Sequence, residues 1–149
     1  MTIIRDMGKG SGISLQCAAE AIYEGYVYKC NSTTDDMTVI TAKGDAAFAI
    51  ALSSTLDPQT GDAKTMTAGD NWNFAMLGSK MVVTVASKTG ITYTKNAKVY
   101  LCDDVDGMIN QTADTSVPIG HYAGPVLTTA ASGQLVEVYL DIATGAATE

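Results

Sequence analysis

Two halves of this 149-residue chain carry the same three β-like segments in the same order. The segments are Tyr26–Asn31, Ala47–Leu52 and Ala68–Phe74 in the first half, and Lys98–Asp103, Pro118–Ala123 and Ser132–Val138 in the second. Val27 and Ala47 lie 20 positions apart, while Val99 and Pro118 lie 19 apart. Chance matches rarely preserve both order and spacing, so the pattern indicates two related β-units.

The third segment is spaced differently in the two halves. Ala47 and Gly69 are 22 positions apart, whereas Pro118 and Gly133 are 15 apart. The surplus falls in the Gly-, Asp- and Thr-rich stretch Thr55–Ala68, which we interpret as a loop inserted into the first unit.

Composition indicates one folded domain with part of its surface covered. A chain of 149 residues can bury roughly two-thirds of its unfolded surface without metals or disulfides. Apolar residues make up 46% and charged residues only 17%, which is sparse for a surface that faces water everywhere. The net charge of −7 and the lack of a basic cluster argue against a nucleic-acid partner.

Cysteine usage and hydropathy predict folding in a reducing compartment. Cys17, Cys30 and Cys102 are odd in number and lack zinc-ribbon or CxxC spacing, so we expect buried, inert thiols and no metal or other cofactor. Met1–Asp6 lacks the pattern of a signal peptide, and no apolar run approaches the ~20 residues of a membrane span. We therefore expect synthesis in a cytoplasm and no membrane partner.

Turn signals divide the chain into about ten short strands, which predicts an all-β barrel or sandwich. Residues 13–22 also fit a short helix capped by Ser14, but the alternation of Ile13, Leu15 and Cys17 favours a strand. Glycine-rich Met1–Gly12 reads as a flexible N-terminal arm, 13–142 as the β-domain, and 143–149 as a flexible tail. The predicted strands are Ile13–Cys17, Tyr26–Cys30, Met37–Thr41, Ala46–Leu52, Trp72–Leu77, Lys80–Ala86, Ile91–Thr94, Ala97–Cys102, Met108–Gln111, Val117–Ala123 and Leu135–Ile142.

The second half resembles the small capsid decoration, or cement, proteins of tailed viruses of bacteria and archaea. That family shows a G-x-x-V-Y-x strand, a Gly-bearing hairpin, an I-G-x-A strand and a final A-x-x-G-x-x-V-x-V-x-L strand. The matching segments here are Lys98–Leu101, Gly107 with Thr112–Ala113, Pro118–Ala123 and Ala131–Leu140. The first half is similar in outline, although Ala49 replaces the usual glycine and the insert is long.

The resemblance implies a structural virion protein and not an enzyme. Such proteins commonly sit as homotrimers on the outer surface of the expanded capsid and cement major capsid protein subunits against internal DNA pressure. The arm of such a protein typically adds a strand to a coat-protein sheet. The corresponding capsid-binding residues here are Thr2, Ile3, Ile4 and Arg5, where Thr2–Ile4 is a β-prone segment on a glycine-rich tether suited to strand addition.

Other candidate sites have simpler structural interpretations. His121 is the only histidine and lies in a predicted strand, without a nucleophile elbow. The acidic run Asp103–Gly107 lacks EF-hand spacing and reads as a turn in which Gly107 has positive φ. Asp57–Asp62 reads as a solvated loop tip, and Gly8–Gly12 lacks the context of a phosphate loop. Trp72 shares a strand face with Phe74 and Met76, where core packing is the default.

Three alternative functions stay open at this point. A tail-tube or head-fibre protein would also be β-rich and acidic. A carbohydrate-binding β-module would need aromatic side chains exposed on one face. A small cysteine hydrolase, which we rank lowest, would need one of the three cysteines beside His121.

Overall fold

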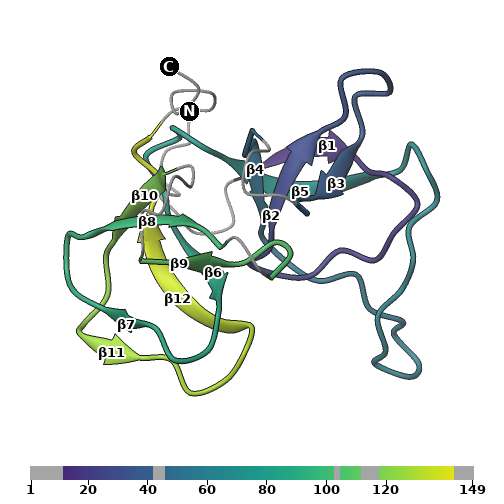
Figure 1. Ribbon diagram of the computed structural model, residues 1–149. Coiled ribbons are helices and arrows are strands. Elements are labelled where there is room, and N and C mark those ends of the chain that lie inside the picture. The colour runs from purple at the N-terminus through teal and green to yellow at the C-terminus, as the bar shows by residue number, and fades with distance from the viewer. Residues whose placement is uncertain (1–11, 42–45, 103–104, 112–117, 143–149) are drawn as a thin grey trace, which may run out of the picture.

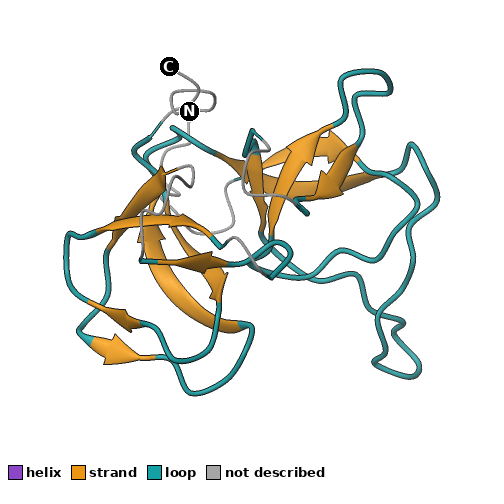
Figure 2. Cartoon of the chain, viewed as in Figure 1, coloured by secondary structure: helices purple, strands orange, loops and turns teal. Residues whose placement is uncertain are grey.

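The computed structural model describes residues 12–41, 46–102, 105–111 and 118–142. The predicted arm, apart from Gly12, and the predicted tail lie outside these ranges. Every regular element in the described part is a strand (Figure 2), which confirms the all-β prediction and the strand interpretation of residues 13–16. No helix of the described part is long and apolar enough to cross a membrane.

The described residues form twelve strands, one more than the eleven segments predicted. The addition is the two-residue strand Leu127–Thr128, which is too short to show alternation in the sequence. The strands are β1 (Ile13–Gln16), β2 (Val27–Cys30), β3 (Met37–Val39), β4 (Ala49–Ala51), β5 (Asn71–Met76), β6 (Val82–Ser87), β7 (Thr92–Tyr93), β8 (Lys98–Leu101), β9 (Ile109–Asn110), β10 (Pro118–Tyr122), β11 (Leu127–Thr128) and β12 (Gln134–Tyr139).

The strands form two separate units, seen as two lobes in Figure 1. The first is a five-stranded sheet in the order β1-β5-β4-β2-β3. The second is a closed barrel in the order β10-β12-β6-β9-β8, with the small β11-β7 sheet beside it. Each half of the chain therefore forms its own β-unit, in agreement with the predicted all-β barrel or sandwich of two related β-units.

The two units share one topology, which supports the internal repeat. Read from β6, the barrel order is β6-β12-β10-β8-β9, which matches β1-β5-β4-β2-β3 strand for strand. Parallel pairing joins the two ends of each series, through Ser87 and Ile109 in the barrel and through Cys17 and Met37 in the first unit. The first sheet is thus also drawn into a barrel-like roll.

Backbone hydrogen bonds repeat residue for residue between the units. Gly25 N–H donates to Ala51 O at 2.9 Å, and Asn96 N–H donates to Tyr122 O at 2.9 Å. Gly25 and Asn96 both have positive φ, at 82° and 66°, in the turn that precedes the repeated strand. Asn is the non-glycine residue that adopts this conformation with least strain, together with Asp.

The register of the repeat differs by one residue from the sequence match at the first segment. Tyr28 on β2 pairs with Ala49 on β4, and Val99 on β8 pairs with Gly120 on β10. Because these two pairs occupy the same position in the two sheets, Val99 is the structural equivalent of Tyr28. Tyr28 and Val99 are both fully buried. The similar Val-Tyr dipeptides suggested that Tyr28 matched Tyr100, but the pleat requires inward-facing positions to match.

Each unit contains a buried threonine that makes the same kind of backbone hydrogen bonds. Thr55 Oγ1 accepts a hydrogen bond from Ile22 N–H at 2.9 Å and donates to a backbone carbonyl at 2.7 Å. Thr129 Oγ1 accepts one from Ile91 N–H at 3.0 Å and also donates to a carbonyl at 2.7 Å. Both residues are 2% exposed. Each hydroxyl therefore satisfies two backbone groups away from water.

The predicted insert Thr55–Ala68 directly precedes Gly69. Seventeen residues separate Ala51 from Gly69, whereas ten separate the equivalent Tyr122 from Gly133. Gly69 and Gly133 are equivalent, because both have positive φ and both donate N–H to a carbonyl at the end of the matching strand, Cys17 O just after β1 and Ser87 O in β6. Residues 57–62 close the insert as a small turn, so it forms a local structure of its own.

One outward-facing row of side chains differs sharply between the units. In the first unit Val27, Ile50 and Ala75 pair across β2, β4 and β5, and all three are buried in a cluster that also contains barrel residues. The equivalent row of the barrel, across β8, β10 and β12, is Lys98, His121 and Tyr139. These three side chains are exposed or half-buried. The first unit thus docks through a face that the second leaves open.

We predict that Thr129→Val lowers the free energy of unfolding by about 1–3 kcal/mol, because valine keeps the shape but leaves the Ile91 N–H and a carbonyl unsatisfied. Urea denaturation would measure the change. Thr128→Val, at an exposed neighbouring position, should stay within about 0.5 kcal/mol of wild type. Equal effects at both positions would contradict an anchoring role for Thr129.

Candidate functional site

The predicted capsid-binding residues Thr2, Ile3, Ile4 and Arg5 lie outside the described residues. Gly12 is the first residue that the structure describes, and it packs closely against the first unit. A Cβ atom added there would come within 2.4 Å of Phe74 O and of Leu52 Cδ1. Glycine is therefore needed where the chain enters β1 beside β5.

His121 lies beside Asp141, while Cys17 and Cys102 pack in apolar clusters. The imidazole Nδ1 of His121 lies 2.8 Å from a carboxylate oxygen of Asp141. Cys17 packs in the core of the first unit, where burial foremost, followed by nearby carboxylates, raises its pKa to about 11. Cys102 packs with Ala86 and Met108 in a small separate cluster. A thiol with a raised pKa is a poor nucleophile at neutral pH.

The aromatic and acidic candidates take mainly structural positions. Phe74 is fully buried, and half-buried Trp72 packs against the same core while its indole N–H donates to Ser53 O at 2.8 Å. In the loop tip, Asp57 accepts a hydrogen bond from Gln59 N–H, as expected for a local turn. Among the described residues no three His, Cys, Asp or Glu side chains cluster as metal ligands; Asp103 and Asp104 lie outside that range.

Gly107 joins the two units, and its predicted positive φ is confirmed at 70°. Its N–H donates to Ile40 O at 2.9 Å, and its carbonyl accepts from Val27 N–H at 2.8 Å. A Cβ atom at this position would come within 2.7 Å of Tyr26 and of Val39. The turn of the barrel thus fits closely against β2 and β3 of the first unit.

Gly25 makes the reciprocal contact from the first unit. Its carbonyl accepts a hydrogen bond from Ala86 N–H of β6 at 2.8 Å. A Cβ atom there would come within 2.5 Å of Leu135 Cδ2 and within 2.9 Å of Ala86 N. In each unit, therefore, a glycine with positive φ contacts the strands of the other unit.

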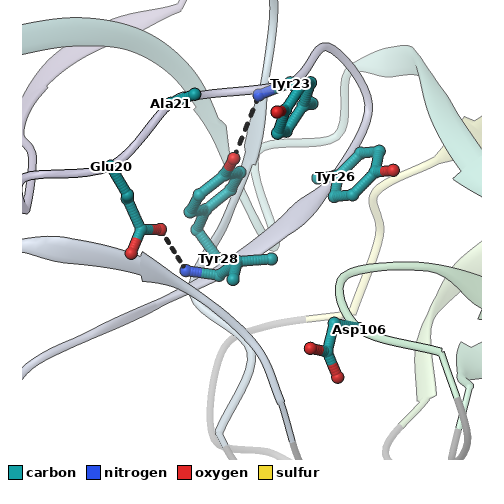
Figure 3. Close-up of a pocket in the computed structure, with 7 residues that line it drawn as sticks. Glu20, Ala21, Tyr23, Tyr26, Tyr28 and Asp106 are labelled. Carbon is teal, nitrogen blue, oxygen red and sulfur yellow. Dashed lines mark hydrogen bonds between the residues drawn. The ribbon is translucent and has the colours of Figure 1, made fainter. Parts of the chain in front are cut away.

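A pocket of about 250 Å³ lies beside the Gly107 contact (Figure 3). Tyr23 and Tyr26 form an aromatic wall, with ring centroids 5.3 Å apart and an angle of 40° between the planes. The Tyr28 hydroxyl accepts a hydrogen bond from Tyr23 N–H at 3.1 Å. The lining comprises Glu20, Ala21, Tyr23, Tyr26, Tyr28, Val39 and Asp106.

Two carboxylates from different units give the pocket its charge. Glu20 belongs to the first unit, and its Oε1 accepts a hydrogen bond from Val39 N–H at 2.9 Å, which fixes the carboxylate at the pocket (Figure 3). Asp106 comes from the turn of the second unit. Burial raises the pKa of Tyr26 and that of Tyr28 above their usual values, so both hydroxyls stay neutral.

Sequence reasoning missed this pocket. The spacing of Tyr23, Tyr26 and Tyr28 resembles ordinary strand and turn composition, and Asp106 is about 80 positions away along the chain. A signal was present in the concentration of three tyrosines around one glycine turn. These tyrosines line a pocket only because the two units dock, and the sequence did not predict that docking.

No family model matches this chain, and no curated protein matches it.

We predict that Gly107→Ala lowers the free energy of unfolding by about 2–4 kcal/mol, since it adds left-handed strain and a clash with Tyr26 and Val39. Gly61→Ala is a matched control, because Gly61 has φ of 78° with open space around it. The control should cost only about 1 kcal/mol of strain. Equal losses in urea denaturation would show that the contact with the first unit contributes nothing.

Proposed function

We propose that this protein is a structural virion protein that binds the outer surface of the expanded capsid and cements neighbouring major capsid protein subunits. The observation that carries the proposal is the arrangement of the resembling segments. They fall on β8, β10 and β12, which lie side by side in one barrel in that order. The first unit repeats the same arrangement with β2, β4 and β5.

The architecture suits a mechanical role. Two units joined by reciprocal backbone hydrogen bonds form a body that can transmit load between separate contact sites. The arm residues Thr2–Arg5 would add a strand to an exposed coat-protein edge, as their β-prone sequence allows. A homotrimer would hold three such arms, and each bound arm would raise the effective concentration of the others.

The copy number of the chain in purified particles of its source tests the proposal. We expect about one copy per coat subunit by quantitative mass spectrometry, because trimers at the local threefold positions of a capsid give that stoichiometry. A far lower ratio would favour the tail-tube or head-fibre alternative. Absence from the particles would overturn a virion role and favour a carbohydrate-binding module.

We predict that deleting residues 1–11 weakens attachment to expanded capsids without changing the melting temperature. The deletion retains Gly12, which packs against the first unit. Co-sedimentation with capsids and thermal unfolding would measure the two effects. Replacing Ile3 and Ile4 by Ser in the full-length chain should reproduce the attachment defect, while Ser11→Ala in the glycine-rich tether should not. A large fall in melting temperature would show that the arm belongs to the fold.

A further inference from the structure

The second unit carries different side chains at the positions equivalent to the pocket tyrosines, although the backbone there is equivalent. In the first unit Tyr23 N–H donates to the Tyr28 hydroxyl at 3.1 Å. In the second unit the equivalent Thr94 N–H donates to Gln111 Oε1, also at 3.1 Å, and Gln111 Nε2 donates back to Thr94 Oγ1. The backbone N–H at this position therefore has a side-chain hydrogen-bond acceptor in both units, but the acceptor need not be a tyrosine.

The other pocket tyrosines also differ from the equivalent residues of the second unit. Tyr26 corresponds to Ala97, because their carbonyls accept equivalent hydrogen bonds from the neighbouring strand. Tyr28 corresponds to Val99 by strand register. Tyr23 remains 43% exposed despite its large apolar ring. Tyr28 packs in the core of the first unit, but two further aromatic rings, Tyr23 and Tyr26, stand at the pocket where the same fold uses Thr and Ala, and they point to a ligand.

The side chains that line the pocket favour a positively charged ligand. Glu20 and Asp106 supply carboxylates, and none of the seven lining residues carries a positive charge. Neutral tyrosine rings attract cations through their electron-rich faces. The net charge of −7 adds a long-range attraction for a basic partner.

We propose that this pocket binds the guanidinium group of an arginine presented by a partner polypeptide. A planar guanidinium can stack on the ring of Tyr23 or Tyr26 while its edge donates hydrogen bonds to a carboxylate. Glu20 is held in place by Val39 N–H, so one acceptor is positioned before binding. Binding here does not depend on capsid attachment, since the partner is defined only by its basic side chain.

The test uses the isolated full-length protein and two peptide probes. Acetyl-Gly-Arg-Gly-amide carries the guanidinium, and acetyl-Gly-citrulline-Gly-amide is its neutral analogue of the same shape. Titrations followed by ¹H–¹⁵N NMR should show saturable shifts at the amides of the lining residues with the arginine probe. The citrulline probe should bind about 2- to 30-fold more weakly, as expected for the loss of one cation–π and charge contact.

Matched variants distinguish arginine binding in the pocket from nonspecific attraction to the negatively charged protein. Glu20→Gln combined with Asp106→Asn removes both charges while keeping an acceptor for Val39 N–H, and Tyr23→Thr installs the residue of the second unit. Both variants should lose the preference for arginine. Glu137→Gln removes one exposed charge on β12 and should keep it.

Three results would overturn the proposal. Equal affinity for the two peptides would exclude recognition of the charge. Unchanged arginine binding in the variants would place it elsewhere on the surface. Saturable shifts of the lining amides with a neutral oligosaccharide, but not with the arginine peptide, would identify a carbohydrate site instead.

Discussion

The arrangement of the two units depends on a reciprocal contact between glycine turns. Gly107 of the second unit hydrogen-bonds to both β2 and the residue after β3, while Gly25 of the first unit accepts from β6. Backbone atoms can approach this closely only where no Cβ intervenes and where positive φ is tolerated. The contact also creates the pocket, because it brings Asp106 next to Glu20 and the tyrosines. Docking, pocket shape and pocket charge therefore share one structural cause.

Local features of the fold could be predicted from the sequence, and long-range features could not. Alternation and turn residues located eleven strands, and the repeat predicted two related units because spacing survives divergence of side chains. The one-residue register error arose at Tyr28, where dipeptide similarity competed with the inward and outward alternation of the pleat. The parallel bridge of Cys17 with Met37, which draws the first sheet into a roll, could not be predicted because a single bridge leaves no local pattern.

The two units also show which residues the fold needs and which serve other purposes. Each unit has a buried threonine that satisfies backbone groups, and the positive-φ turn before the repeated strand persists as Gly25 or Asn96. Around Tyr23 the same backbone is completed by different side chains. The two units thus act as an internal control: agreement between them marks what the fold requires, and disagreement marks positions that the fold leaves free to vary.

The outward-facing rows of the two units also limit how the architecture can grow. The first unit covers Val27, Ile50 and Ala75 by docking against a different surface of the second, so the contact is head-to-tail. Head-to-tail contacts propagate into open filaments when every subunit carries both complementary surfaces. In the second unit Lys98, His121 and Tyr139 replace the apolar row. A third unit could therefore not dock onto this row through the apolar contact that the first unit uses.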